Sequence, residues 1–127
     1  MLSNSEIHAN IPASDLERAR SFYAYKLGLT PSSEDVTGLT YKTPGGSWFQ
    51  IYETSYAGTA GHTIAQWDVD DIEEEVSALR AKGIVFEEYD MPGVEWNNGI
   101  ASAPFGRAAW FKDSEGNTMC LDERAKG

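Results

Sequence analysis

Hydrophobic positions in the first thirty residues change from the spacing of a strand to the spacing of a helix. Residues 6–12 are β-prone, and Ser14 and Glu17 follow them with the spacing of a capping box. Apolar residues then recur every three or four positions, which places one side of a helix on Leu16, Ala19, Phe22, Tyr23 and Leu27. We predict a strand at 6–12 and a helix at 14–27 that is closed by Gly28.

The following residues predict a hairpin that completes a structural module. Residues 37–43 and 47–53 are β-prone and flank a Pro-Gly-Gly turn at 44–46. Together with the first strand and helix, this hairpin makes a βαβββ unit over about 5–54. Residues 55–61 are small and polar, which is typical of a connection between two units.

The second half of the chain repeats the same order of patterns. Residues 63–69 are β-prone and are followed by a helical pattern at 72–81 that stops at Gly83. Three more strands are predicted at 84–89, 106–112 and 118–122. We therefore expect a second βαβββ module over about 62–124, both modules in one domain of residues 1–127, and a frayed tail after residue 122.

One long segment, residues 90–105, interrupts the second module. It is rich in Pro, Gly and Asn and is too long for a minimal turn, so we predict a binding loop or lid. Trp96 lies in this loop without a periodic reason to be buried. It is either an aromatic side chain that faces a ligand or a local packing anchor.

Side chains alternate along a strand, so the predicted strands divide into two faces. The apolar set, which should face the helices, is Ala9, Ile11, Phe49, Ile51, Ala65, Trp67, Val69, Met119 and Leu121. The other set is His8, Asn10, Trp48, Gln50, Tyr52, Ile64, Gln66, Asp68, Thr118, Cys120 and Asp122. This mixture of polar and aromatic groups predicts a small-molecule site on the second face.

Residues 15–29 contain Asp-Leu-Glu-x-Ala-x-x-Phe-Tyr followed by Leu-Gly-Leu, and this pattern resembles the opening of the vicinal oxygen chelate superfamily. That superfamily includes glyoxalases, bleomycin-resistance proteins and extradiol dioxygenases. Segments 48–52, 70–83 and 112–121 resemble the same family, so the resemblance covers about residues 6–124. It implies an α+β fold of two βαβββ modules that form a curved, cup-like mixed sheet with helices on its outer face. It also implies a homodimer, because family members commonly pair or exchange modules.

The resemblance also implies four positions for metal ligands, one on each of four strands. These positions fall on His8, Gln50, Ile64 and Cys120, and isoleucine cannot coordinate a metal. His62 could replace Ile64 only if a bulge shifted the strand. We therefore favour no metal cofactor. If a metal is bound, its ligands should be His8, Gln50, His62 and Cys120, with zinc as the first choice and nickel, manganese or iron as the others.

Three classes of function remain open at this point. The leading hypothesis is a metal-free binding protein for an aromatic or cationic organic molecule, and the residues expected to contact the ligand are His8, Asn10, Trp48, Gln50, Tyr52, Ile64, Gln66, Trp96 and Cys120. The alternative is a lyase, isomerase or dioxygenase that uses a divalent metal, as a glyoxalase I does. A metal-free enzyme would use His8 as its catalytic base, with Gln50 or Asn10 donating to an oxyanion. A ligand sensor or accessory subunit is a third possibility.

Charge and composition narrow the choice of partners. Twenty acidic and ten basic residues give a net charge of −10, which argues against nucleic acid and anionic membranes as partners. The same surplus is either an ordinary solvated surface or a feature that attracts a cationic ligand. No apolar run reaches the length of a membrane span, and Cys120 is the only cysteine, so we expect a cytoplasmic protein without an intrachain disulfide.

Overall fold

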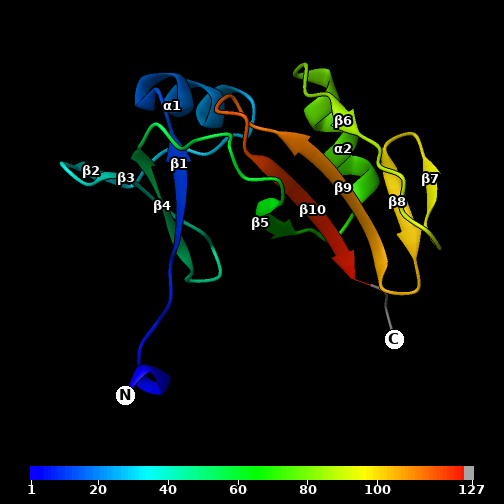
Figure 1. Cartoon of the computed structure of the whole chain (residues 1–127), viewed down its shortest axis with the longest axis horizontal. Coiled ribbons are helices and arrows are strands. Elements are labelled where there is room, and N and C mark those ends of the chain that lie inside the picture. Colours follow the sequence, from blue (N-terminus) through cyan, green and yellow to red (C-terminus); the bar gives the residue numbers. More distant parts are fainter. Residues whose placement is uncertain (125–127) are drawn as a thin grey trace.

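The strands of this protein form two separate sheets, and each sheet has one helix packed on it (Figure 1). The structure is a computed structural model, and it describes residues 1–124. A single 3₁₀ turn, η1 (Leu2–Asn4), precedes the first strand. The predicted α+β fold of two comparable modules is confirmed, with the strands of each module gathered in a sheet of its own.

The first sheet has the strand order β1-β4-β3-β2. Its elements are β1 (Ala9–Ala13), α1 (Leu16–Tyr25), β2 (Ser33–Asp35), β3 (Gly38–Lys42) and β4 (Trp48–Glu53). β1 runs parallel to β4, whereas β3 is antiparallel to both β4 and β2. The first strand therefore begins at Ala9 rather than at residue 6, and β2 is an additional strand in the polar stretch that precedes the hairpin.

The second sheet has the order β5-β10-β9-β8-β7, and β6 also pairs with β9. Its elements are β5 (Thr63–Asp68), α2 (Ile72–Ala81), β6 (Phe86–Glu87), β7 (Glu95–Asn97), β8 (Ile100–Ala103), β9 (Gly106–Lys112) and β10 (Thr118–Arg124). β5 runs parallel to β10, as β1 does to β4. β10 continues two residues beyond the predicted strand, so the expected fraying does not begin at residue 123, and residues 125–127 lie outside the described part of the chain.

Helix α1 spans Leu16–Tyr25, which is shorter at both ends than the predicted 14–27, and it has the expected glycine ending but a different cap. Leu29 donates its backbone N–H to the Tyr23 carbonyl over 2.8 Å, and Gly28 has a φ of 73°, which is the glycine-terminated ending that we expected. At the other end, Asp15 is the N-cap and accepts a hydrogen bond from the Arg18 backbone N–H at 3.0 Å. The predicted capping box of Ser14 and Glu17 was wrong.

The predicted loop at residues 90–105 contains a hairpin made of β7 and β8. Asn97 pairs with Ile100, so Asn98 and Gly99 form a two-residue turn with φ values of 55° and 85°. Positive φ at both central residues is the reason why Asn-Gly favours such turns. The Asn-Gly dipeptide predicts this hairpin. The Pro and Gly residues elsewhere in 90–105 favour an irregular loop instead, which is why the hairpin was not expected.

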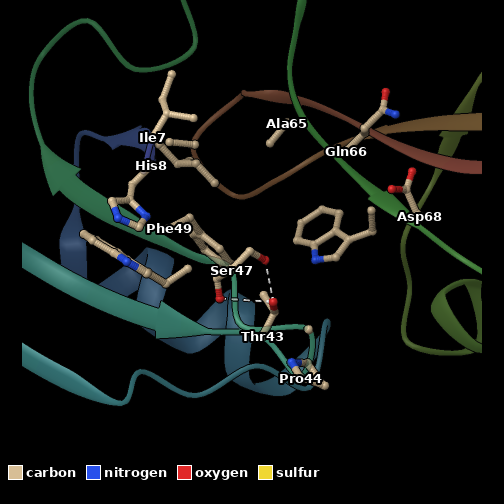
Figure 2. Close-up of a pocket in the computed structure, with 14 residues that line it drawn as sticks. Ile7, His8, Thr43, Pro44, Ser47, Phe49, Ala65, Gln66 and Asp68 are labelled. Atoms are coloured by element: carbon tan, nitrogen blue, oxygen red, sulfur yellow. Dashed lines mark hydrogen bonds between the residues drawn. The ribbon is translucent and has the colours of Figure 1, made fainter. Parts of the chain in front are cut away.

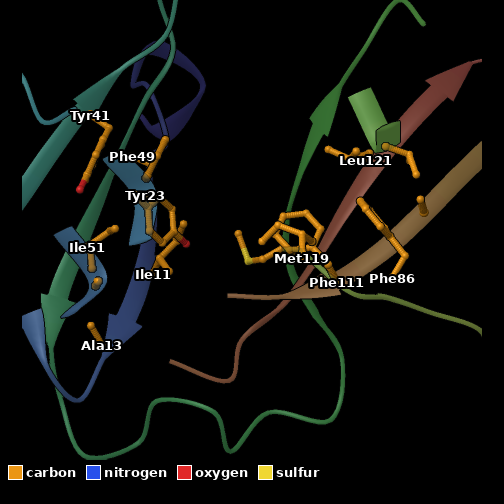
Figure 3. Packing of buried hydrophobic residues seen from close by; sticks show 14 of the residues in the cluster. Ile11, Ala13, Tyr23, Tyr41, Phe49, Ile51, Phe86, Phe111, Met119 and Leu121 are labelled. Carbon is orange, nitrogen blue, oxygen red and sulfur yellow. The ribbon is translucent and has the colours of Figure 1, made fainter. Parts of the chain in front are cut away.

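One hydrophobic core joins the two modules (Figure 3). Ile11, Tyr23 and Ile51 contribute from the first module, and Phe111 and Met119 contribute from the second. All five side chains are almost completely buried, with relative exposures of 0–1%. The alternation of apolar residues along β1, β4 and β10 therefore predicted the core-facing side of these strands correctly.

The turn between β9 and β10 fastens the second module to the first. Tyr23 donates its hydroxyl to Asp113 Oδ2 at 2.8 Å, and Asn117 Nδ2 donates to the Pro12 carbonyl at 2.8 Å. Gly58 passes so close to this turn that a Cβ atom there would lie 2.7 Å from the Glu115 carbonyl oxygen. The contacts hold the end of β1 and the start of α1 against the second module.

β1 and β5 are neighbours at the junction of the two sheets. β1 is the edge strand of the first sheet and β5 is the edge strand of the second, and the two strands contact each other. Each strand pairs with one partner in its own sheet. A seam between edge strands therefore runs through the middle of the molecule.

Candidate ligand-binding site

A cavity of about 740 Å³ opens along the seam between β1 and β5 (Figure 2). We call it the inter-sheet cavity. Its lining residues come from both sheets and from the turn between β3 and β4: Ile7, His8, Ala9, Ile11, Thr43, Pro44, Gly45, Ser47, Trp48, Phe49, Ala65, Gln66, Trp67 and Asp68. Its volume lies within the range of about 300–1,000 Å³ that is typical of small-molecule sites.

The wall on the first sheet is aromatic. The rings of His8 and Trp48 lie against each other, with centroids 3.4 Å apart and planes inclined by 30° (Figure 2). His8 immediately precedes β1 and Trp48 is the first residue of β4, and the two strands are parallel neighbours in which Ala9 pairs with Phe49. His8 also has Nε2 3.8 Å from Glu6 Oε2, so a protonated imidazole would have a carboxylate beside it.

The rim of this wall is a turn closed by hydrogen bonds between Thr43 and Ser47. The Thr43 backbone N–H donates to the Ser47 carbonyl at 2.9 Å, and the two hydroxyl oxygens lie 2.6 Å apart (Figure 2). Gly46 has a φ of 90° within this turn, a conformation that glycine adopts without strain. The predicted Pro-Gly-Gly turn therefore forms the edge of the cavity as well as the end of a hairpin.

The wall on the second sheet is the free edge of β5. Ala65 and Trp67 point toward the core, and Gln66 and Asp68 point to the other face, yet all four line the cavity. An edge strand with no neighbour on one side exposes residues of both faces to the same space. The separation of strand residues into two faces therefore missed Phe49, Trp67 and the other core-side residues as cavity walls.

The charge of the lining is negative. Asp68 is the one carboxylate among the lining residues, and no lysine or arginine of the described chain is among them. Aromatic faces attract cations because of their ring quadrupoles, and a carboxylate adds a full opposite charge. The cavity is therefore suited to a planar or aromatic molecule with a positive charge.

Asn10, Gln50 and Tyr52 lie away from the inter-sheet cavity. With Thr37 they line a second, open cavity of about 400 Å³ on the outer face of the first sheet. The Gln50 amide donates to the Thr37 carbonyl at 2.7 Å and to its hydroxyl at 2.8 Å. These bonds hold the amide nitrogen toward β2 and β3, and they leave the amide oxygen of Gln50 without a described protein partner.

Trp96 packs into an aromatic cluster on the second sheet. Its ring centroid lies 6.4 Å from that of Tyr89 and 5.9 Å from that of Trp110. Burial, followed by the hydrogen bond to Glu87, raises the pKa of Tyr89 to about 12, so its hydroxyl stays protonated at neutral pH. These contacts favour the interpretation of Trp96 as a packing anchor, although its buried Nε1 has no hydrogen-bond partner in the described chain.

Cys120 is buried beside this cluster, on the face that was expected. It pairs with Trp110 across the sheet and is 3% exposed. Burial and the nearby Asp122 carboxylate raise the pKa of the thiol to about 11. A neutral thiol is a poor nucleophile and a poor metal ligand.

Ile64 lies at an irregularity in the pairing of β5 with β10. Thr118 pairs with Thr63, whereas Met119 pairs with Ala65, so Ile64 is the extra residue of a bulge. Its side chain packs against the hydrophobic core. The expectation that Ile64 faces the cup was therefore wrong, because strict alternation does not survive a bulge.

The four candidate metal ligands do not come together. His8 lines the inter-sheet cavity, Gln50 the second cavity and His62 a third one beside Trp110, while Cys120 is buried. Within residues 1–124, no group of three or more His, Cys, Asp or Glu side chains is placed to hold a metal ion. The described residues therefore bring together no donor set that fits a divalent metal, and no step of a metal-dependent reaction is built on them.

The family model of the glyoxalase/bleomycin resistance protein/dioxygenase superfamily matches residues 7–121. The chain belongs to this superfamily. A search of curated proteins found no match. Membership agrees with the two-module fold, and it defines no ligand, because the superfamily fold carries many functions.

Solved structures show the same fold at low sequence identity. UcmS2 is 21% identical with a TM-score of 0.68, over 90% of this chain and 93% of that chain. TnmS3, an antibiotic binding protein from Streptomyces sp. CB03234, is 20% identical with a TM-score of 0.63, over 95% and 98%. FosX from Listeria monocytogenes, a fosfomycin resistance protein complexed with Mn(II) and sulfate, is 13% identical with a TM-score of 0.70, over 96% and 91%.

Among the described residues, no helix is long and apolar enough to cross a membrane.

Proposed function

We propose that this protein binds a cationic aromatic small molecule in the inter-sheet cavity. The observation that carries the proposal is the composition of the lining, which combines His8, Trp48 and Trp67 with the carboxylate of Asp68 and includes no described lysine or arginine. Burial of an aromatic ligand supplies the affinity, and the carboxylate selects for positive charge. TnmS3, an antibiotic binding protein with this fold, supports small-molecule binding as a role for it.

The aromatic pair of His8 and Trp48 forms one side of the proposed site. The two rings already lie against each other, so little side-chain entropy is lost when a ligand packs on the exposed surface of the pair. The proposal needs no proton transfer by His8, which acts as a wall of the site. The role of His8 as a catalytic base stays a prediction. Gln50 and Asn10, the residues expected to donate to an oxyanion, line a different cavity.

Isothermal titration calorimetry with N-methylquinolinium tests the proposal. We expect micromolar binding, which corresponds to about −8 kcal/mol, and much weaker binding of the neutral naphthalene and the anionic 2-naphthoate. Asp68→Asn should remove most of the preference for the cation, and Trp48→Ala should weaken binding about tenfold, or ~1.4 kcal/mol. Tyr56→Ala is the matched control, because Tyr56 is exposed and does not line the cavity. Equal affinity for the three compounds would contradict the proposal.

We also propose that the protein is a cytoplasmic homodimer in which residues 1–127 of each copy form one domain. The shared hydrophobic core supports a single domain, and the lone buried Cys120 is compatible with a reducing compartment. The open cavity at Asn10, Gln50 and Tyr52 is a surface that a second copy could cover. Sedimentation velocity would test the dimer, and Tyr52→Glu should shift the distribution toward the monomer.

A further inference from the structure

A second, smaller and half-open apolar cavity shares Trp67 and Asp68 with the inter-sheet cavity. It has a volume of about 190 Å³ and lies between the end of α1, helix α2 and the second sheet. We call it the inner chamber, and its lining consists of Leu27, Leu29, Trp67, Asp68, Val69, Glu75, Leu79, Phe111 and Leu121. Seven of these nine side chains are apolar, so the chamber offers no set of hydrogen-bond partners for ordered water.

Trp67 and Asp68 line both cavities. Trp67 is half-buried and stacks on Phe111, with ring centroids 6.4 Å apart and planes inclined by 18°. It therefore stands between the aromatic wall formed by His8 and Trp48 and the leucine-rich chamber. The two cavities therefore meet at Trp67 and Asp68.

The size and charge of the chamber define what it would accept. An apolar cavity of about 150 Å³ can hold a benzene molecule, so the inner chamber has room for one phenyl-sized group. Asp68 and Glu75 are the two polar residues of its lining, and both are carboxylates. A ligand with a positive charge near Asp68 and an apolar substituent against the leucine side chains would match this lining.

We propose that the inner chamber is a specificity subsite, in which Trp67 separates the part that holds the aromatic cation from a part that holds one phenyl-sized apolar substituent of the same ligand. This inference rests on the proposed function, because it assigns the substituent of a ligand whose core occupies the inter-sheet cavity. It narrows the ligand class to aromatic cations with a single compact apolar arm on or beside the charged atom.

A series of N-substituted quinolinium ions tests this inference. Affinity should rise roughly fourfold for each methylene added between N-methyl and N-butyl, because each buried methylene transfers apolar surface out of water. N-benzyl should bind at least as tightly as N-butyl, and N-(1-naphthylmethyl) should lose the gain because it exceeds the chamber. An affinity that does not depend on the substituent would overturn the inference.

Variants that fill the chamber distinguish the affinity contributed by the substituent from the affinity contributed by the aromatic core of the ligand. Leu79→Trp should abolish the gain from butyl or benzyl and leave the affinity for N-methylquinolinium within about twofold. Leu29→Trp fills the chamber from the opposite wall and provides a second variant if Leu79→Trp does not fold. Val85→Trp adds the same side chain at an exposed position outside both cavities and should change neither affinity.

The outcomes distinguish this inference from the proposed function. If N-methylquinolinium binds and the longer ions bind no better, the inner chamber is not a subsite and the proposed function stands. If the gain is present but survives both filling variants, the substituent lies elsewhere and the inference is overturned. If no quinolinium ion binds while circular dichroism shows a folded protein, both proposals fail.

Discussion

The two helices of this protein have similar local caps but different long-range anchors. Asp15 and Asp71 are the N-caps of α1 and α2, and each accepts a backbone hydrogen bond from the residue three positions later. Beyond these caps, α1 is anchored by the other module through Glu115, whereas α2 is anchored by its own module through Glu123. Both helices therefore begin at an aspartate cap, but the glutamate that holds the first turn comes from the other module for α1 and from the same module for α2.

Glu115 is the stronger of the two anchors. Its Oε1 accepts from the backbone N–H groups of Ser14 and Asp15 at 3.0 Å each, and Arg18 Nε donates to Oε2 at 2.8 Å. The carboxylate is buried at the positive end of the helix dipole of α1. Because these bonds cross between modules, the loss of Glu115 affects both the helix and the junction of the modules.

Glu123 makes a more exposed anchor in the second module. Its Oε2 accepts from the Ile72 backbone N–H at 2.8 Å, and Arg107 donates to its Oε1 at 2.9 Å. Arg107 also donates to Glu73 Oε1 at 2.9 Å, which links the helix to β9. This network lies within one module, so its loss should loosen α2 and leave the junction of the modules intact.

Glu115→Gln should have the largest effect on stability. The substitution keeps a similar volume but removes the charge that accepts six hydrogen bonds from Ser14, Asp15, Arg18 and Ser114, so the free energy of unfolding should fall by about 3 kcal/mol. Urea unfolding followed by circular dichroism measures the loss. The equivalent change in the second module, Glu123→Gln, is the matched control, and a larger loss for the control would contradict the comparison.

The contribution of Glu115 should also depend on pH. Burial alone would raise its pKa, but the hydrogen bonds from Arg18, from the Asp15 backbone and from Ser114 outweigh burial and lower the pKa to about 2. The folded-state pKa lies below the ordinary value of 4.5, so the stabilisation is complete above about pH 4.5 and is lost as the pH falls toward 2. Urea midpoints between pH 7 and pH 3 should fall more steeply for the native protein than for Glu115→Gln. Parallel curves would show that Glu115 does not carry this dependence.

Tyr23→Phe should have the next largest effect. It removes the buried hydroxyl that donates to Asp113 Oδ2 and leaves that oxygen with the Asn117 amide as its remaining side-chain donor. A loss of about 1.5 kcal/mol is expected from one hydrogen bond to a charged group. Tyr25→Phe is the control, because Tyr25 is exposed on the same helix. Equal effects of the two substitutions would show that the contact between the modules contributes little.

Glu123→Gln should have the smallest effect of the series. Its side chain is 17% exposed, so water can replace part of the lost interaction, and a decrease of about 1 kcal/mol in the free energy of unfolding is expected. Hydrogen exchange should become faster in α2 and stay unchanged in α1. Faster exchange in α1 would mean that the two anchors are coupled.

Local sequence patterns predicted the elements that depend on neighbouring residues. The apolar stripe and Gly28 placed α1, and the alternation along β1, β4 and β10 identified the core side, because these properties follow from spacing alone. The Asn98-Gly99 dipeptide is an equally local signal, and it marks the turn between β7 and β8. The Asp15 cap of α1 is local in the same way, but the second anchor is not, because Glu115, about a hundred residues away, binds the backbone N–H groups of Ser14 and Asp15.

The candidate site also combines features that follow from local sequence with features that depend on distant contacts. Its aromatic residues His8 and Trp48 could be assigned to one face from the sequence, and the structure places them together. Trp67 and Phe49 were assigned to the core and also line the inter-sheet cavity, because β5 is an edge strand at an open seam. Ile64 was assigned to the wrong face because its bulge depends on pairing with β10.

The sequence by itself determined the two repeated modules, their helix stops, the apolar faces of their strands and the acidic charge that disfavours anionic partners. These features depend on periodicity and composition, which are local or additive along the chain. Only the tertiary structure decided that β1 and β5 meet as unpaired edges, that Glu115 anchors the helix of the other module and that Asp68 lines the same cavity as His8, Trp48 and Trp67. Such features depend on contacts between residues that are distant in sequence, and no local pattern encodes them.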